Sequence, residues 1–348
     1  MIGSAFKGLG RGFAESLFQN QASPFIGLFI GILATGLIQS SSTTTSLVVG
    51  MVAAGTFGSD PKLAVAAAVP YIMGANIGTS ITNTIVSLGH IVNREEFKRA
   101  FSASVVHDFF NILAVIIIFP LELMFGIISK FAIALSSILM GSGGGTFTSP
   151  IKLITKPTVK WIEHLFQQQS IIEPNALLLV AALAFLFFSL RNLTKLIKSL
   201  VMFRLQAFFD THIFRTTLRA MFFGVIITIL VQSSSITTSL VIPLAGAGIL
   251  NLRQIFPYTL GANIGTTVTS LLASMVSGTI APLAVALSHL SFNILGIGLL
   301  WPIKKVREIP IHLAEWFSNL ATQNKIYPLL YILIVFFLIP LSLISLVR

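Results

Sequence analysis

Long apolar runs without a charged side chain dominate the chain and predict helices embedded in a membrane. The runs are Pro24 to Ser59, Leu63 to Asn93, Pro174 to Leu190, Ala220 to Leu252, Gln254 to Ile303 and Ile326 to Val347. A spanning helix needs about 20 residues. The first run, with 36 residues, would extend about 54 Å as one straight helix, well beyond a hydrocarbon core of about 30 Å. This run must therefore fold back on itself or break.

Eight consecutive polar residues, Gln39 to Ser46, lie in the middle of the first run and predict the position of that break. Backbone polar groups cannot face lipid unpaired. The segment is therefore expected to lie inside protein or to line a cavity, as the tip of a re-entrant hairpin. A loop outside the membrane is the alternative.

The pattern occurs twice in the chain. Gln39 to Val48 matches Gln232 to Val241 at an offset of 193, Gly74 to Thr79 matches Gly261 to Thr266 at 187, and His107, Phe110 and Asn111 match His289, Phe292 and Asn293 at 182. The order of the three blocks is the same in both halves. The sequence therefore predicts two homologous repeats.

Charge in the loops predicts that the repeats are inverted. Between the second and third blocks, repeat one is charged from Arg94 to Arg99, whereas the corresponding loop around 277–282 has no charge. After the third block the bias reverses, because Lys304 to Arg307 is basic and 121–130 carries only one lysine. By the positive-inside rule, 94–99 and 304–307 are cytoplasmic and the other two loops lie outside. Inverted repeats are typical of secondary transporters with a central site.

These patterns predict an all-α polytopic membrane protein in five parts. The parts are an N-terminal segment 1–23, transmembrane repeat one 24–140, a linker 141–205, transmembrane repeat two 206–310, and a C-terminal segment 311–348 with a final transmembrane helix. The linker is expected to hold an interfacial helix and a connecting transmembrane helix. Each repeat is expected to contain a re-entrant helical hairpin and broken transmembrane helices.

Composition agrees with a membrane protein. Of the 348 residues, 55% are apolar and only 9% are charged, against about 25% charged residues in soluble domains. This excludes an ordinary soluble enzyme and a nucleic-acid-binding domain. The net charge of +11 fits cationic loops against anionic membrane lipids. The chain has no cysteine, which excludes disulfides and thiolate metal sites.

The repeated Gln-Ser-Ser-Ser segments are the strongest candidates for a ligand site. Hydroxyls, an amide and backbone N–H groups at a helix start offer hydrogen bonds and positive potential to an anion without a buried cation. The same oxygens suit a hard cation such as Na⁺. Packing between helices is the alternative for a single Ser/Thr-rich turn. Repetition in an inverted pair favours a substrate site.

Two further repeated blocks carry polar groups. Gly flanks Asn76 and Asn263, which favours an unwound turn before a new half-helix, although a kink without a ligand role is also possible. Asp108 is unmatched in repeat two and lies in an apolar segment, where a carboxylate is costly. It is expected to bind Na⁺ or a proton, or to pair with a buried donor such as His107. Glu122 is expected at the membrane interface.

The motifs resemble those of the type II sodium-dependent phosphate cotransporters. The similarity covers about residues 24–130 and 215–320 and includes both Gln-Ser-Ser-Ser segments, both Gly-Ala-Asn-Ile-Gly-Thr turns and the block His107-Asp108-Phe109-Phe110-Asn111. The resemblance implies two hairpins, cytoplasmic termini and uptake of inorganic phosphate driven by sodium. No enzyme motif is present, and no cofactor or transition metal is expected beyond Na⁺ as the coupling ion.

The resemblance also implies site residues. Those expected to border phosphate are Gln39, Ser40, Ser41, Ser42, Asn76, Gln232, Ser233, Ser234, Ser235 and Asn263. Those expected to bind sodium are Thr79, Asn83, Asp108, Gln232, Ser233, Thr266 and Thr269. Animal members have Ser where this chain has Ala75 and Ala262, and they carry a long disulfide-bearing loop that is missing here. The chain therefore resembles a bacterial inner-membrane member. Another oxyanion, proton coupling or a phosphate sensor are the alternatives.

Overall fold

The computed structural model describes residues 23–139 except 54, 56 and 59, residues 213–346 except 276–279, and ten residues between 157 and 181. Residues 1–22 of the predicted N-terminal segment and nearly all of the linker, including almost all of its expected connecting helix, lie outside the described residues.

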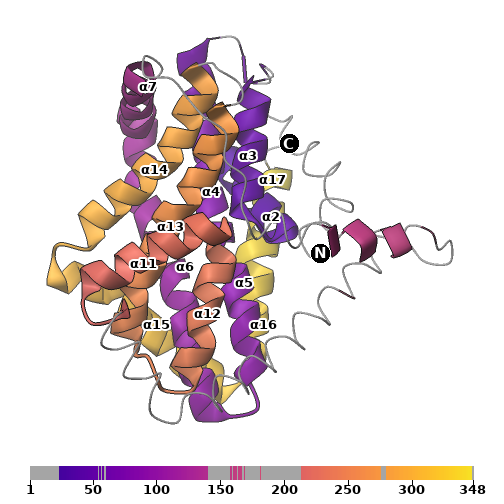
Figure 1. Ribbon diagram of the computed structural model, residues 1–348, viewed down its shortest axis with the longest axis vertical. Helices are drawn as coiled ribbons and strands as arrows, with labels where there is room; N and C mark the ends of the chain where they lie inside the picture. The colour runs from indigo at the N-terminus through magenta and orange to yellow at the C-terminus, as the bar shows by residue number, and fades with distance from the viewer. Residues whose placement is uncertain are drawn as a thin grey trace.

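The described part of the chain is helical and contains no strand (Figure 1). The first half holds α2 (Pro24–Ile38), α3 (Ser41–Ala53), α4 (Pro61–Gly78), α5 (Ile81–Ser87), the 3₁₀ turn η1 (Leu88–His90), α6 (Arg94–Phe125) and α7 (Ile127–Leu139). The second half holds α11 (Thr217–Val231), α12 (Ser234–Gly246), α13 (Leu252–Met275), α14 (Ile280–Leu300), α15 (Lys304–Gln323), α16 (Ile326–Leu333), the π-helical η4 (Ile334–Leu338) and α17 (Ile339–Leu346).

Four helices of the described residues are long and apolar enough to cross a membrane. They cover Pro61–His90, Arg94–Phe125, Ile280–Leu300 and Ile326–Leu346. Together with the composition, they make the chain an all-α polytopic membrane protein, as the sequence predicts.

Two stretches expected as charged loops are the first turns of helices. Asn93 caps α6 by accepting hydrogen bonds from the backbone N–H groups of Glu95 and Glu96 at 3.1 and 3.2 Å. Two acidic residues in the first turn also favour the positive end of the helix dipole. Lys304 to Arg307 likewise begins α15, which continues past the predicted boundary at residue 310. The basic residues therefore belong to the N-terminal turns of α6 and α15 and not to the loops before them.

Helix α15 is tied to the start of α13 by an ion pair. Arg253 donates to the carboxylate of Glu308 at 2.8 Å, and the guanidinium lowers the pKa of that carboxyl group. The Arg253 side chain is more than half exposed, so the pair adds little stability. It does fix which face of the amphipathic α15 points toward α13.

The two halves use the same close helix crossing. Helix α2 packs against α4, and α11 packs against α13. A Cβ added at Gly74 would lie inside 3.0 Å of the Leu28 carbonyl oxygen, and one added at Gly261 would clash equally with Met221. The backbones therefore touch at equivalent positions, which only glycine permits.

This crossing corrects the predicted unwound turns. Helix α13 continues through Gly261 and Gly265 to Met275, and α4 continues through Gly74 to Gly78. The chain departs from α-helix only at Thr79 and Ser80, after the motif and before α5. The glycines serve close approach of a neighbouring helix, so they give no unwound turn at Asn76 or Asn263.

The halves are interleaved as well as equivalent. Helix α3 packs against α13 and α14 of the second half, and α12 packs against α5 and α6 of the first. Each Gln-Ser-Ser-Ser helix therefore lies against the other half of the chain. The core of the molecule forms between the halves as much as within them.

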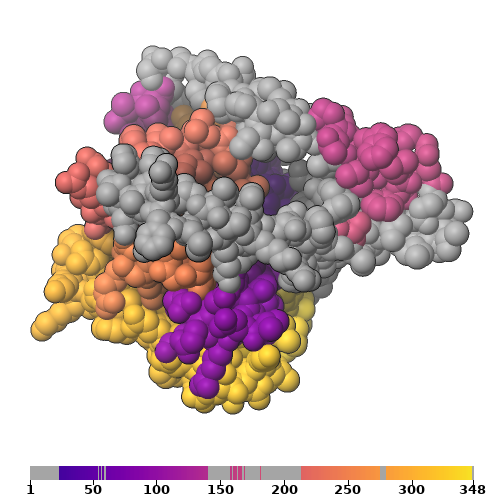
Figure 2. All heavy atoms as spheres, turned by 60° about the horizontal axis from the view of Figure 1, so that its bottom comes forward, coloured from indigo at the N-terminus to yellow at the C-terminus, as the bar shows by residue number. Residues whose placement is uncertain are grey.

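The two basic stretches lie in the same half of the molecule. In Figure 1 the start of α6 is at the lower end of the molecule, α15 lies in the lower half, and α7 is at the upper end. With that lower end turned forward, Figure 2 shows the purple region that includes the start of α6 next to the yellow C-terminal part of the chain, and α15 packs against α6. This arrangement agrees with a shared side of the membrane for both stretches, and which side it is stays a prediction.

Glu122, which the sequence places at the membrane interface, lies where one helix ends and the next begins, and its depth in the membrane stays a prediction. It is 6% exposed, and its carboxylate accepts hydrogen bonds from the backbone of Ile128 at 2.7 Å and from both the backbone and the hydroxyl of Ser129. Helix α6 ends at Gly126, whose φ of 60° is left-handed. The chain turns there, so Glu122 reaches the first N–H groups of α7 and caps that helix.

Candidate functional site

Both Gln-Ser-Ser-Ser segments form the same sharp break between two helices. Gln39 ends α2 and Gln232 ends α11, each with φ 55° and ψ 33°. They are the only described residues other than glycine with positive φ. A side chain in this left-handed region costs on the order of 1–2 kcal/mol. Strain repeated at two equivalent positions points to a function for the break.

The residue after each glutamine caps the next helix. The Ser40 hydroxyl accepts from the backbone of Thr43 at 3.2 Å, and the Ser233 hydroxyl accepts from the backbone of Ile236 at 3.3 Å. Helices α3 and α12 therefore begin at the two breaks. Their first N–H groups and the positive ends of their dipoles lie at the tips.

The two tips meet. The Ser42 hydroxyl donates to the Gln232 carbonyl oxygen at 3.5 Å, although the residues are 190 positions apart. Ser41, Ser234 and Ser235 are also buried beside this contact, with 3%, 2% and 6% of their surface exposed. The structure thus brings both predicted phosphate-binding segments together at one place between the halves.

The two glutamine side chains differ. The Gln39 amide oxygen accepts from the Thr82 hydroxyl at 2.8 Å, and its amide nitrogen donates to the Gly36 carbonyl. At the offset of 187, the counterpart of Thr82 is Thr269. No hydrogen bond joins Gln232 to Thr269 in the described part of the chain, and the Gln232 residue is 8% exposed. Of the two glutamines, Gln232 therefore has the side-chain amide that is available to bind a ligand.

Reciprocal hydrogen bonds cross between the halves behind the tips. The Thr45 hydroxyl bonds the Ser270 hydroxyl at 2.7 Å, and the Thr238 hydroxyl donates to the Asn83 amide oxygen at 2.9 Å. Thr45 and Thr238 are equivalent, as are Asn83 and Ser270. Asn83, a predicted sodium-binding residue, thus lies against α12.

The predicted phosphate residues Asn76 and Asn263 lie in a second reciprocal network. His107 Nε2 is 2.6 Å from the Asn263 amide oxygen, and His289 Nε2 is 3.3 Å from the Asn76 amide oxygen. The Asn263 amide nitrogen also donates to the Asn111 side chain at 2.9 Å. These amides join α4 and α13 to α14 and α6. Their place beside phosphate stays a prediction.

The predicted sodium residues of the second block occupy two settings. The hydroxyls of Thr79 and Thr266 donate to the carbonyl oxygens four residues earlier, Ala75 at 2.9 Å and Ala262 at 3.0 Å. Their lone pairs remain able to accept or to coordinate. Thr269 is partly exposed, one turn further along α13.

Asp108 is fully buried in α6, and its partner was not foreseen from the sequence. Its Oδ2 accepts a hydrogen bond from the Tyr331 hydroxyl at 2.9 Å. His107, the expected alternative partner, points to Asn263 instead. The other carboxylate oxygen, Oδ1, has no hydrogen-bond partner among the described residues.

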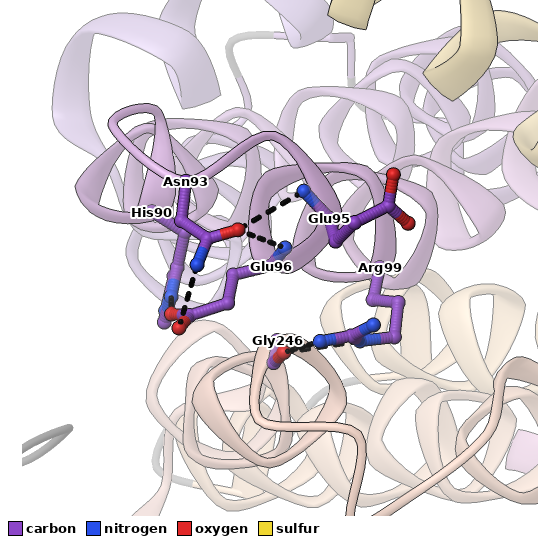
Figure 3. Close-up of polar contacts among 6 residues, drawn as sticks. All are labelled: His90, Asn93, Glu95, Glu96, Arg99 and Gly246. Atoms are coloured by element: carbon purple, nitrogen blue, oxygen red, sulfur yellow. Dashed lines mark hydrogen bonds and ion pairs between the residues drawn. The ribbon is translucent and has the colours of Figure 1, made fainter.

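The C-terminal end of α12 is held by Arg99 of α6 (Figure 3). The Arg99 guanidinium donates from Nε at 3.1 Å and from Nη2 at 2.8 Å to the Gly246 carbonyl oxygen, at the last residue of α12. A cation suits the negative end of a helix dipole. Nearby, His90 Nδ1 lies 3.4 Å from the Glu96 carboxylate. Arg99 therefore clamps α12 to α6.

Replacing Arg99 by Ala is expected to lower the free energy of unfolding by about 1 kcal/mol, because two charge-assisted hydrogen bonds are lost at an exposed site. Arg99→Lys should restore part of the effect. Thermal melting of purified protein in detergent measures this, with Arg94→Ala as the control because Arg94 is exposed on the same helix. Equal melting temperatures for Arg94→Ala and Arg99→Ala would show that the clamp contributes nothing.

Sequence reasoning missed Tyr331 and the residues that join the halves behind the tips. A signal existed for Thr45 and Thr238, which lie inside the repeated segments. Tyr331 lies outside both repeats, in a run of apolar residues without a motif. Only the folded arrangement places it beside Asp108.

Comparison with known proteins finds one family and a set of relatives. The model of the family described as Na+/Pi-cotransporter matches residues 1–143 and 185–324. Sodium-dependent phosphate transport protein 2B of Homo sapiens is 32% identical, with 98% of this chain and 62% of the relative covered. Sodium-dependent phosphate transport protein 2A of Ovis aries is 32% identical, with 98% and 64% covered. The chain thus spans less than two thirds of these relatives. No solved structure gives a significant match.

Proposed function

Because the chain belongs to the Na+/Pi-cotransporter family, a family of transporters and not of enzymes, we propose that it is a sodium-coupled secondary active symporter. It imports inorganic phosphate by alternating access and holds the phosphate between the two Gln-Ser-Ser-Ser tips. No covalent chemistry is involved.

The observation that carries this proposal is the meeting of the two tips. The Ser42 hydroxyl contacts the Gln232 backbone, so the starts of α3 and α12 converge on one place. An anion there meets hydroxyls and backbone N–H groups at the positive ends of two helices. Phosphate oxygens are strong acceptors and match this set of donors.

The tips contain no lysine or arginine, so they offer no fixed positive charge. Bound sodium would supply the missing charge and preform the anion site. The free amide of Gln232, together with Ser233, Thr266 and Thr269, forms the proposed sodium site of repeat two. Asp108 forms a second, charged cation site in repeat one.

Helix length supports re-entrant hairpins. Helices α2 and α3 have 15 and 13 residues, which is about 20 Å each, whereas the hydrocarbon core is about 30 Å thick. Neither helix spans the membrane alone, and the same holds for α11 and α12. Together with the reversal of charge between corresponding segments, this supports inverted repeats with cytoplasmic termini.

The test is uptake of radiolabelled phosphate into proteoliposomes of the purified protein, with and without an inward sodium gradient. Uptake is expected to rise at least tenfold with the gradient and to exceed equilibrium. Empty liposomes are the control. Accumulation that ignores sodium, or that follows a proton gradient instead, would rule out sodium coupling.

Competition separates phosphate from other oxyanions. Arsenate, which has the same shape and protonation, is expected to inhibit uptake, and sulfate is expected not to. Strong inhibition by sulfate would point to a different oxyanion as the substrate. Phosphate binding without accumulation would point to a sensor.

A further inference from the structure

Asp108 and its surroundings have no counterpart in the second half of the chain. At the offset of 182, repeat two has Leu290 where repeat one has Asp108. The Asp108 carboxylate has no exposed surface. The side chains of Ser80 and Thr84 lie near it, and their hydroxyls donate to the carbonyl oxygens of Ile77 and Ser80 at 2.8 and 3.4 Å. Ser80 lies in the short interruption between α4 and α5. The carboxylate thus faces hydroxyls at the point where the chain leaves the α-helical path.

Tyr331 comes from a helix that belongs to neither repeat. It lies on α16, and its hydroxyl donates to Asp108 Oδ2 at 2.9 Å, 223 positions away. This hydrogen bond therefore joins a carboxylate that has no counterpart in the second repeat to a helix that lies outside both repeats.

The tyrosine ring is held by aromatic neighbours. Its centroid lies 4.9 Å from that of Phe317 on α15 and 5.7 Å from that of Phe336, with an interplanar angle of 90° to the latter. Phe336 belongs to the π-helical segment η4, and it is fully buried. Such π-helical turns occur frequently at functional sites. The wider π-helical turn places Phe336 against the ring of Tyr331, which lies five residues earlier in the chain. This contact fixes the direction of the Tyr331 hydroxyl.

The hydrogen bond leaves the carboxylate half satisfied. Oδ2 is bonded to Tyr331, whereas Oδ1 has no partner among the described residues. A buried carboxylate oxygen without a partner is costly in an apolar surrounding. A hard cation that takes oxygen ligands removes this cost.

We propose that Tyr331 is a positioning residue for the cation that Asp108 binds: its hydroxyl fixes Oδ2 and presents Oδ1 to a sodium ion beside Ser80 and Thr84. The inference rests on the proposed function, because sodium is the ion it assigns to Asp108. It adds a part of the C-terminal segment to the ion site.

Tyr331→Phe tests the proposal because it removes the hydroxyl and keeps the ring. Tyr327→Phe is the matched control, since Tyr327 lies one turn earlier on the same helix and is 42% exposed. The sodium concentration for half-maximal phosphate uptake is expected to rise about fivefold in Tyr331→Phe, as for the loss of one hydrogen bond of about 1 kcal/mol. The phosphate concentration for half-maximal uptake at saturating sodium should stay within twofold of wild type.

A double-mutant cycle separates positioning from general structural damage. In an Asp108→Gly background, Tyr331→Phe is expected to have no further effect on sodium activation. An equal effect in both backgrounds, or a Tyr331→Phe variant that behaves like Tyr327→Phe, would overturn the proposal.

Sodium-dependent melting keeps this test distinct from that of the proposed function. Sodium chloride, against choline chloride at equal ionic strength, is expected to raise the melting temperature of the wild type and to raise that of Tyr331→Phe less. If uptake ignores sodium, the proposed coupling fails, and this comparison still decides the role of Tyr331. A wild type without any sodium-induced shift, or equal shifts in both proteins, would refute that role.

Discussion

Replacing Gln232 by Ala is expected to reduce sodium-driven phosphate uptake by about tenfold to a hundredfold. Gln232 is the glutamine whose amide has no hydrogen bond within the described residues, and it lies at the meeting point of the tips. Removing a group that binds a charged ligand costs about 1.5–3 kcal/mol, which corresponds to that range. The left-handed backbone is strained with either glutamine or alanine at this position. Because the substitution adds no further strain, the fold should be retained.

Matched variants make this result specific. Gln323→Ala removes the same side chain from an exposed position at the end of α15 and should transport normally. Gln232→Asn keeps an amide and suits the left-handed region, so it should retain more uptake than Gln232→Ala. Initial uptake rates and melting temperatures measure both effects. Normal uptake by Gln232→Ala, at normal expression and melting temperature, would remove the residue from the site.

Gly74→Ala is expected to destabilise the protein by on the order of 3 kcal/mol or more, because the added methyl group would collide with the Leu28 carbonyl oxygen. Backbone cannot yield as a flexible side chain can, so α2 and α4 would have to separate. Gly261→Ala should act equally in the second half, where the carbonyl belongs to Met221. Thermal melting and the fraction of monodisperse protein in detergent report the loss.

Gly298→Ala is the control for this pair, because a Cβ at Gly298 in α14 would meet nothing within 4 Å. Alanine is the better helix former by about 1 kcal/mol, so this variant should be unchanged or slightly more stable. A loss of stability in Gly74→Ala and a gain in Gly298→Ala would separate the effect of close helix packing from that of backbone flexibility. A stable Gly74→Ala protein would show that the helices do not touch as described.

The sequence predicts most of the site because the site is repeated. Gln39 and Gln232 occur in matching segments, and their breaks have identical dihedral angles. A polar run inside an apolar one must break, so local sequence suffices there. The contact between Ser42 and Gln232 is different, because it depends on how the two halves dock.

The prediction of unwound turns at Asn76 and Asn263 was wrong for a physical reason. Glycine both loosens a helix and lets another helix approach, and the residues around Gly74 do not say which. The deciding partner, the Leu28 carbonyl, is remote in the sequence. Tyr331 is a similar case, since nothing in its own segment signals that Asp108 lies opposite.

The glycine crossings also determine which joints of the molecule can slide. The backbones of α2 and α4 touch at Gly74, and those of α11 and α13 touch at Gly261. Because no layer of side chains lies between them, we expect each pair of helices to move as one rigid body. The contacts of α3 with α13 and of α12 with α5 run through threonine, serine and asparagine side chains, which can exchange partners. In the proposed transport cycle, we therefore expect the movement to take place at these polar contacts, with each helix pair carrying its Gln-Ser-Ser-Ser tip.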